Sequence, residues 1–294
     1  RMAEERLEVK RTSQLNDLAQ SISYGDIHEG VKITVHRMTS VSDTLRDRYD
    51  EVSPPLLSIS KQLQRSITRQ LQDQRRGGRQ TGLYMGRRLD VHALPRDDGR
   101  VFSKMRLPND TPELAIGLLL DESGSMGCGS RATYARAAAI ILYDFCQSLH
   151  IPVMVYGHST DDGVALYSYA EFDSIDQLDR YRMMDISARG SNRDGAALRF
   201  VAEQLAKRSE DIRLLILVSD GQPADAGYYG TAAEEDLRGI KAEYRRKGIC
   251  FVAAAIGDDK DSIERIYADA FLDISDLHTL PVTLTNVVKR FIRT

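Results

Sequence analysis

The chain has 294 residues, of which 42% are hydrophobic and 28% are charged, and its formal net charge is −3. This composition is typical of a globular protein with one large domain and an appendage, or with two small domains. No apolar run approaches the ~18–20 residues that a membrane-spanning helix needs, so we expect no membrane span.

Three cysteines, Cys128, Cys146 and Cys250, lie far apart and show no C-x-x-C spacing. This usage fits a reducing compartment better than a disulfide framework, and we expect a cytoplasmic protein. The first residue is Arg1, with no secretory signal, and we expect the chain to be a fragment of a longer one.

Residues 1–75 are expected to form a helical and irregular appendage. Ser40–Asp43 has the spacing of a capping box, which predicts a helix that Pro54 and Pro55 end. Apolar residues then recur at helical spacing and predict an amphipathic helix: Leu56, Ile59, Leu63, Ile67 and Leu71. Arg75–Gly78 breaks this pattern and indicates a boundary.

A basic stretch follows. Between Arg65 and Arg106, eleven Lys and Arg residues stand against four acidic ones, a local excess of about +7. Such a charge could contact nucleic acid or an acidic protein. Because no aromatic platform is interleaved with the charges, we interpret residues 76–107 as a solvated basic connector and do not expect nucleic-acid binding.

Residues 108–294 predict an α/β domain, since apolar runs alternate with helical stretches. The expected strands are Leu114–Leu120, Val153–Tyr156, Val164–Tyr169, Ile212–Val218 and Cys250–Ile256, with a short sixth strand at Phe271–Ile274. The expected helices are Tyr134–Leu149, Ala196–Lys207, Ala232–Lys247 and a closing helix at Leu280–Ile292. Strands this apolar are buried on both faces, which predicts a doubly wound, mostly parallel sheet.

Polar loops follow these strands, and in a parallel sheet they gather at one edge, where ligands bind. The loops are Asp121–Ser125, Gly157–Asp162, Ser219–Gly221 and Gly257–Asp259. They carry carboxylates and hydroxyls with little basic charge, so this edge suits a cation. No glycine-rich phosphate loop is present, and the G-x-S-x-G pattern of a hydrolase is incomplete, so we expect neither nucleotide binding nor serine hydrolysis.

A hard divalent ion explains the first loop. Ser123 and Ser125 can turn toward the same ion because Gly124 lets the backbone bend between them, and Asp121 supplies charge directly or through a water. Magnesium prefers six oxygen ligands and usually keeps several waters. We therefore expect Mg²⁺, or another divalent cation such as Mn²⁺ or Ca²⁺.

The arrangement of Asp121, Ser123 and Ser125 after an apolar strand resembles the metal-ion-dependent adhesion site of von Willebrand factor A domains. Members of that family also carry an aspartate at the end of the fourth strand, where this sequence has Asp220. The resemblance implies that these four residues share one metal ion.

The family's remaining ligand comes from a second loop, usually a threonine before a helix. In this sequence the corresponding segment is Gly190–Leu198. When Gly195 is aligned with the family's glycine, Asn192 takes the position of the threonine, and Ser191 is next to it. Either residue could supply this contact. The expected metal ligands are Asp121, Ser123, Ser125, Asn192 and Asp220.

Three stretches point to particular groups within this family: Arg88–Asp90, Asn192–Leu198 and Ser219–Pro223. They are similar to the A-domain subunit of aerobic cobaltochelatase and to nitric-oxide-reductase activation proteins. The resemblance covers about Arg87 to the C-terminus. It implies an AAA+ ATPase partner, of MoxR or chelatase type, and a client metalloprotein.

Our hypothesis is an adaptor that is not itself catalytic, in which a partner's acidic residue completes the metal shell. The alternative is a non-catalytic subunit of a cobaltochelatase that takes part in inserting metal into a tetrapyrrole, where His158 or the Asp161–Asp162 pair could contribute.

Near the site, we expect Asp194 to begin a helix. We expect Glu122 to point away from the ion and Cys128 to be structural.

Overall fold

The computed structural model describes residues 2–75, 78–83, 88–95, 101–106, 113–174, 176–221, 223–256 and 271–292. It divides into two compact units: Arg1–Gln64 with Glu113–Thr294, and Arg65–Pro112. The predicted loop Gly257–Asp259 lies outside the described residues.

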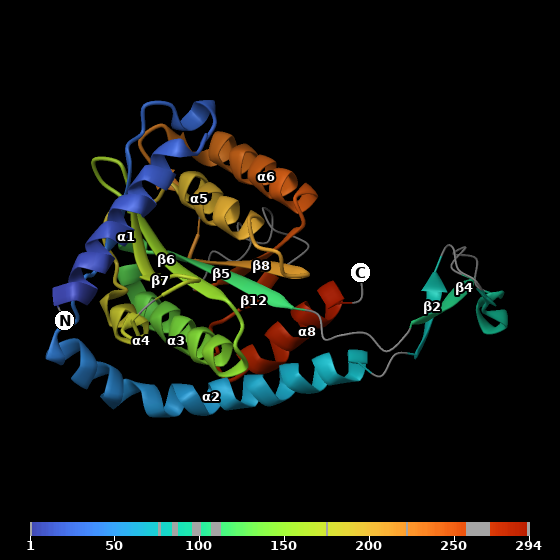
Figure 1. Cartoon of the computed structure of the whole chain (residues 1–294). Helices are drawn as coiled ribbons and strands as arrows, with labels where there is room; N and C mark the ends of the chain where they lie inside the picture. Colours follow the sequence, from blue (N-terminus) through green and yellow to red (C-terminus); the bar gives the residue numbers. More distant parts are fainter. Residues whose placement is uncertain are drawn as a thin grey trace. The chain divides into compact units, whose positions relative to one another are not determined.

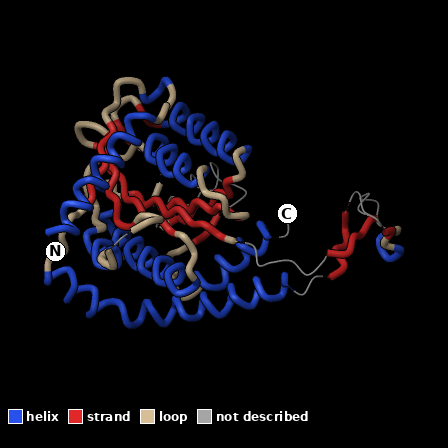
Figure 2. Tube along the Cα trace, viewed as in Figure 1, coloured by secondary structure: helices blue, strands red, loops and turns tan. Residues whose placement is uncertain are grey.

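A seven-stranded sheet forms the centre of the first unit (Figure 2). In spatial order it contains β1 (Ile33–Arg37), β7 (Val164–Ala170), β6 (Val153–Thr160), β5 (Leu114–Asp121), β8 (Ile212–Ser219), β11 (Ile249–Ala255) and β12 (Phe271–Asp273). All neighbours are parallel except β6 and β7. The expected mostly parallel α/β sheet is therefore confirmed, including its short strand β12.

Helices cover both faces of this sheet (Figure 1). They are α1 (Met2–Ser21), α3 (Arg131–Leu149), α4 (Asp179–Arg182), α5 (Asp194–Ala206), α6 (Gly230–Arg246) and α8 (Leu280–Ile292). One face carries α1, α5 and α6, and the other carries α3, α4 and α8. A longer helix, α2 (Asp43–Arg75), begins in this unit.

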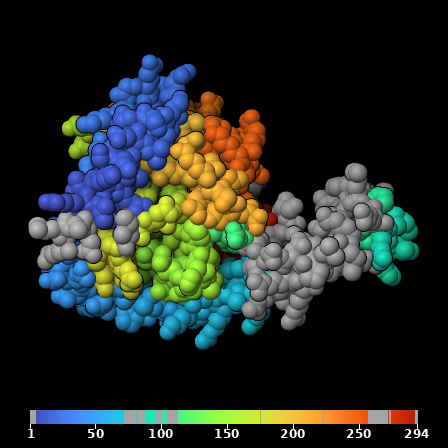
Figure 3. Space-filling view, in the orientation of Figure 1, coloured from blue at the N-terminus to red at the C-terminus, as the bar shows by residue number. Residues whose placement is uncertain are grey.

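The apolar runs of the sequence are buried as their pattern predicts. Every residue of β5 and β6 is buried. On one face, side chains of the sheet, α1, α5 and α6 share a core whose members include Leu15, Ala19, Leu119, Phe200, Leu237 and Tyr244. In the space-filling view the atoms of α1, α5 and α6 lie next to one another (Figure 3).

Strand β6 is longer than predicted. We expected it to end at Tyr156 and His158 to lie in a loop, but the strand continues to Thr160. It does so because β7 turns back and pairs with it antiparallel, with His158 opposite Leu166. Antiparallel pairing extends the strand through polar residues that apolar patterning alone does not identify.

The N-terminal segment contributes a strand that we did not expect. Residues 1–75 were interpreted as a helical appendage, yet β1 pairs parallel with β7 and forms an outer strand of the sheet. Its sequence, ITVHR, alternates apolar and polar residues over only five positions. So short a pattern does not identify a strand without its tertiary partner.

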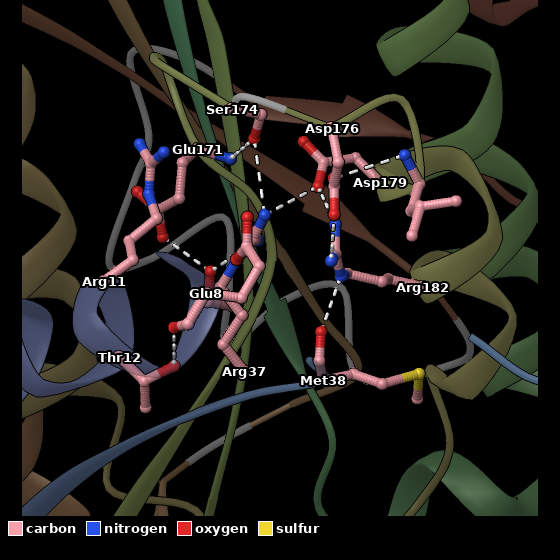
Figure 4. Close-up of polar contacts among 12 residues, drawn as sticks. Glu8, Arg11, Thr12, Arg37, Met38, Glu171, Ser174, Asp176, Asp179 and Arg182 are labelled. Atoms are coloured by element: carbon pink, nitrogen blue, oxygen red, sulfur yellow. Dashed lines mark hydrogen bonds and ion pairs between the residues drawn. The ribbon is translucent and has the colours of Figure 1, made fainter. Parts of the chain in front are cut away.

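A buried ion network joins this segment to the sheet and α4 (Figure 4). Arg37 Nε lies 2.5 Å from Glu8 Oε2, and Arg37 donates from Nη2 to Asp179 Oδ1 at 2.9 Å. Arg182 donates to the same Asp179 oxygen at 2.7 Å and to the carbonyl of Met38 at 2.8 Å. Removing one member would leave its partners charged and buried, a large penalty.

Helix α2 corrects a second expectation. It begins at Asp43, where Ser42 Oγ accepts from the amide of Leu45, and it continues through Pro54 and Pro55, which we predicted would end it. A proline inside a helix removes a hydrogen bond and costs ~3 kcal/mol. Buried side chains before and after the prolines offset this cost: Tyr49 precedes them, and Ile59 and Leu63 follow. Ser60 also donates to Asp144 of α3 at 2.6 Å.

The second unit contains a three-stranded antiparallel sheet where we expected a connector. Its strands, in spatial order, are β2 (Gly78–Leu83), β4 (Phe102–Arg106) and β3 (Arg88–Leu89). A short 3-10 turn, Val91–Ala93, follows β3, with Asp90 accepting from the amide of His92 at 3.3 Å.

Among the described residues, none of the helices combines the length and the apolar character that crossing a bilayer requires.

Candidate metal centre

The carboxyl ends of β5 and β8 place the predicted ligands together. Asp121 is the last residue of β5, and Asp220 directly follows β8, its neighbour in the sheet. Ser123 and Ser125 lie in the turn after β5, which continues as a 3-10 segment, Gly124–Ser130. Because the two strands are parallel, all four side chains lie at one edge of the sheet.

Hydrogen bonds connect these side chains. Ser123 Oγ and Ser125 Oγ are 2.9 Å apart, and Ser125 donates to Asp220 Oδ1, also at 2.9 Å. Asp121 Oδ1 accepts from the amide of Ser123 at 2.8 Å, and Asp121 Oδ2 accepts from Ser219 Oγ at 3.0 Å. The side chains are therefore held in fixed orientations.

This spacing fits an octahedral ion. Oxygens at adjacent corners of a shell with metal–oxygen distances of ~2.0–2.1 Å are about 2.9 Å apart. The separations from Ser123 Oγ to Ser125 Oγ and from Ser125 Oγ to Asp220 Oδ1 have this value. The donors are all oxygen, the chemistry that magnesium and calcium prefer. The residues present therefore fit a hard divalent cation.

Asn192 lies beside Asp121 but uses its amide in a particular way. Its Nδ2 donates to Asp121 Oδ2 at 3.3 Å, while its Oδ1 accepts from the amide of Ala224 at 2.7 Å. In this arrangement the amide nitrogen faces Asp121 and the oxygen joins the second loop to the chain after β8. Asn192 thus supports Asp121, and its role as a metal ligand stays a prediction.

Ser191 occupies the rim of the same site. Its backbone pairs with Thr160 at the end of β6 through hydrogen bonds of 2.7 and 2.8 Å. This pairing fixes the second loop against the sheet. Whether Ser191 or Asn192 takes the second-loop position also stays a prediction.

A cavity of about 490 Å³ opens above these residues. Its lining includes Ser123, Gly124, Ser125, Ser191, Asn192, Asp220 and Gly221. Main-chain bonds hold its walls together: Gly124 donates to the carbonyl of Gly190 at 2.7 Å, and Arg189 donates to that of Glu122 at 2.6 Å. The first and second loops therefore form one rigid rim.

Arg131, which we did not predict as a site residue, also lines the cavity. Its Nη1 donates to Asp220 Oδ2 at 2.7 Å, and its side chain is 23% exposed. Burial raises the pKa of Asp220, and the Arg131 guanidinium opposes that shift. We expected this helix to begin at Tyr134, which left Arg131 outside it; the helix in fact begins at Arg131, a position where acidic residues are favoured.

Glu122 points away from the cavity, as predicted. Tyr169 donates to its Oε1 at 2.5 Å, and Arg189 donates to its Oε2 at 2.6 Å. Burial raises the pKa of Glu122 to about 7, against the opposing effects of Tyr169 and Arg189. The Glu122 side chain therefore joins the first loop to Arg189 on the second.

His158 and Asp194 form a buried pair beneath Asp121. His158 Nε2 lies 3.2 Å from Asp194 Oδ1, at an angle unsuited to a hydrogen bond, so the attraction is electrostatic. Burial opposes a charged His158, but Asp194, Asp121 and Glu122 outweigh it and raise its pKa. A fully buried His158 cannot contact a tetrapyrrole, which removes the role that the alternative hypothesis gave it.

Burial raises the pKa of Asp121, and the negative charge of Asp194 raises it further. His158 and Ser123 act in the opposite direction. Asp194 is also the first residue of α5, as expected. An aspartate there interacts favourably with the helix dipole.

The residues after Asn192 join the second loop to the N-terminal segment. Arg193 donates to Asp225 Oδ2 at 2.7 Å and to the carbonyl of Ile27 at 3.0 Å. Gly195 faces the pair formed by His28 and Asp236, where a Cβ would collide with both side chains. The motif thus requires glycine because another part of the chain approaches closely.

Among the described residues, no three or more His, Cys, Asp and Glu side chains are grouped for metal binding. The site at the sheet edge combines two carboxylates with neutral oxygens instead. Cys128 is exposed in the turn after Ser125, and no disulfide involves it. Its expected structural role stays a prediction.

An open, doubly wound α/β domain with this D-x-S-x-S turn defines a class of metal-dependent protein-interaction modules. The sequence model of the von Willebrand factor type A domain matches residues 115–272, just over half of the chain. The chain belongs to this family.

Two relatives extend the comparison. Protein YojO from Bacillus subtilis (strain 168) is 23% identical over 261 residues, which cover 83% of this chain and 40% of YojO. Protein NorD from Brucella suis biovar 1 (strain 1330) is 31% identical over 102 residues, 33% of this chain and 16% of NorD. The chain thus matches less than half the length of either relative.

The chain is also similar to a solved structure, that of the vWF domain of the type V pili tip protein Mfa5 from Porphyromonas gingivalis. That domain is 11% identical, with a TM-score of 0.45, over 62% of this chain and 95% of that one.

Proposed function

We propose that the domain binds Mg²⁺ at the carboxyl edge of its sheet and uses the bound ion to recruit a partner protein. The observation that carries this proposal is a continuous series of hydrogen bonds that links Asp121 to Ser123, Ser123 to Ser125, and Ser125 to Asp220. Asp121 ends β5, Ser123 and Ser125 lie on the turn that follows it, and Asp220 follows β8.

Each residue has a distinct part in the proposed site. Asp121 and Asp220 supply the negative charge. Ser123 and Ser125 supply neutral oxygens, which do not reduce the positive charge of the ion. Asn192 holds Asp121 in place and is the proposed second-loop ligand. When bound, the ion provides a Lewis-acidic position for a carboxylate of the partner, which a Glu or Asp side chain would supply.

The proposed biological role is that of a cytoplasmic adaptor. We infer that it works with an AAA+ ATPase of MoxR or chelatase type in the activation or assembly of a client metalloprotein. The similarity of 102 residues to NorD supports this role, as does the resemblance of Asn192–Leu198 to nitric-oxide-reductase activation proteins.

Metal titration tests the proposed site. Mg²⁺ and Mn²⁺ are titrated into the wild type and Asp121→Ala by calorimetry, with melting temperature followed in parallel. At 100 times Kd, a bound ion stabilises the fold by ~2.7 kcal/mol, which raises Tm by several degrees. We expect this shift in the wild type and its loss in Asp121→Ala.

The control is Asp162→Ala, an exposed acidic residue in the turn between β6 and β7. It should respond to metal as the wild type does, because its carboxylate lies outside the cavity lining. Equal heats and equal Tm shifts in the wild type and Asp121→Ala would contradict the proposed site.

A further inference from the structure

An arginine lies at the metal site, although a cation is what the site is proposed to bind. Arg131 donates from Nη1 to Asp220 Oδ2 at 2.7 Å. The other oxygen of the same carboxylate, Oδ1, accepts from Ser125 at 2.9 Å. Both oxygens of Asp220 therefore have partners, and one of them belongs to a positive charge of the chain itself.

The backbone just before Arg131 has an unfavourable conformation. Gly129 and Ser130 both adopt left-handed conformations, with φ of 56° and 63°, and α3 begins at the next residue. Left-handed backbone is strained for serine, and such strain persists where the surrounding structure requires it. This double turn directs the start of α3 toward the cavity.

The position of Arg131 is also unfavourable for the helix. A positive side chain in the first turn opposes the helix dipole, and the first turn of α3 contains no acidic residue that would compensate. The ion pair with Asp220, which is only 4% exposed, provides a reason for an arginine here. Arg131 is therefore part of the site's construction.

This ion pair limits how Asp220 can meet a metal ion. With Oδ2 held by Arg131, only Oδ1 faces the serine hydroxyls, so the carboxylate can offer one oxygen. Mg²⁺ accepts such a shell, because it needs six ligands in a strict octahedron and readily keeps waters. Ca²⁺ prefers six to eight ligands and often takes both oxygens of a carboxylate.

We propose that Arg131 is the residue that sets the ion selectivity of this site, favouring Mg²⁺ and Mn²⁺ over Ca²⁺. It does so by keeping Asp220 to a single available oxygen. The guanidinium also offsets one of the two carboxylate charges, of Asp121 and Asp220, and so lowers the affinity for every divalent ion. This inference rests on the proposed function, because it concerns the same metal site.

The test compares ions and variants. Arg131→Met keeps a long unbranched stem and removes every N–H donor, whereas Arg131→Lys keeps the charge without the planar fork. Kd values for Mg²⁺, Mn²⁺ and Ca²⁺ are measured by calorimetry, each ion alone. We expect Arg131→Met to bind Ca²⁺ at least tenfold more tightly and Mg²⁺ only a few-fold more tightly, with Arg131→Lys between it and the wild type.

Arg238→Gln is the control, since Arg238 is a half-exposed arginine of α6 that pairs with Glu234. It should leave all three Kd values unchanged. Circular dichroism and Tm confirm that each variant is folded, and Arg131→Gln replaces Arg131→Met if that variant does not fold.

The outcomes separate the two proposals. If the wild type binds Mg²⁺ and the ratio of the Ca²⁺ and Mg²⁺ Kd values is the same in Arg131→Met, the selectivity role of Arg131 is overturned while the metal site stands. If the wild type binds no ion and only Arg131→Met binds one, Arg131 blocks the site instead of setting its selectivity, and the inference is overturned. If no variant binds any ion, the proposed function is overturned, and the inference with it.

Discussion

At Asp121, three hydrogen bonds fix a carboxylate that burial alone would disfavour. The donors are the amide of Ser123, the hydroxyl of Ser219 and the side-chain amide of Asn192. Burial still raises the pKa of Asp121, so these bonds only partly replace water. A carboxylate held this way is preorganised for a ligand, because little side-chain freedom remains to be lost on binding.

Gly195 shows a similar constraint on the backbone. A Cβ at this position would collide with Asp236 Oδ2 and Tyr228 Oη and would lie 2.9 Å from His28 Nε2. We expect Gly195→Ala to lower the free energy of unfolding by about 1–3 kcal/mol, the usual cost of overpacking. Urea denaturation measures this loss.

The matched control for this prediction is Gly239→Ala in the middle of α6, where an added Cβ meets nothing within 4 Å. Alanine is the better helix former by ~1 kcal/mol, so this variant should be neutral or more stable. If the Gly195→Ala protein is as stable as the Gly239→Ala protein, the side chains of His28 and Asp236 move aside without a measurable cost, and the prediction is wrong.

Glu171 allows a pH prediction away from the proposed metal site. It is buried and accepts from Tyr156 and from Ser168, the latter at 2.5 Å. Burial raises its pKa, which Arg37 and Arg11 oppose. The folded state therefore binds a proton more tightly than the unfolded chain. The penalty for ionising Glu171 is absent below its unfolded pKa and grows as pH rises through the folded one.

We expect Glu171→Gln to be more stable than the wild type at pH 7, by on the order of 1 kcal/mol, because glutamine carries no charge and its oxygen can accept the same bonds. The difference should shrink as pH falls toward 4. Urea midpoints at pH 4, 5.5 and 7 measure it. If the stability of the wild type relative to Glu171→Gln increases as pH rises, the raised pKa of Glu171 is contradicted.

Among the elements, α1 protects the open edge of the sheet. Asn16 donates to the carbonyl of Val35 and accepts from its amide, both at 2.9 Å. Gln20 donates to the carbonyl of Ile33 at 2.9 Å. These side chains occupy backbone groups of β1 that a further strand would otherwise pair with. Covering an edge in this way prevents association with other chains.

The edge contacts predict the behaviour of Asn16→Ala. Losing both bonds to Val35 leaves a backbone donor and acceptor without their partner, which costs about 1–3 kcal/mol. We expect a lower Tm and some concentration-dependent association, measured by light scattering on a size-exclusion column. Ser21→Ala is the control, because the Ser21 hydroxyl donates within its own helix, to the carbonyl of Leu18. A variant whose Tm and molar mass both match those of the wild type at every concentration would contradict this role of α1.

The elements also show what the sequence could predict. Strands β5, β8 and β11 were predictable because long apolar runs fit few places other than a buried sheet. The D-x-S-x-S turn was predictable because its oxygens are close in the chain. By contrast, β1 and the polar half of β6 depend on β7, a tertiary partner that local patterning does not contain. The role of Arg131 was not predictable either, because it depends on the pairing of β5 with β8, which brings Asp220 close to it.

For the whole molecule, charge is unevenly distributed. The chain has a net charge of −3, yet the stretch from Arg65 to Arg106 carries an excess of about +7, and this stretch belongs to the second unit. Net charge sets long-range attraction between molecules, while a local excess acts within about a Debye length, ~8 Å at physiological salt. The remaining residues therefore carry a compensating negative excess, which weakens attraction to a polyanion.

This balance predicts that the full chain does not bind a 20-base-pair DNA duplex at 150 mM salt in a fluorescence anisotropy titration. If all seven excess charges contacted phosphates, log K would fall with log salt at a slope of about −6, so any binding at 50 mM salt would be lost. The charge-reversal variant Arg65→Glu/Arg69→Glu alters two exposed residues of α2 and should behave like the wild type at 150 mM. Micromolar binding at 150 mM salt that this variant abolishes would instead make the basic stretch a nucleic-acid contact.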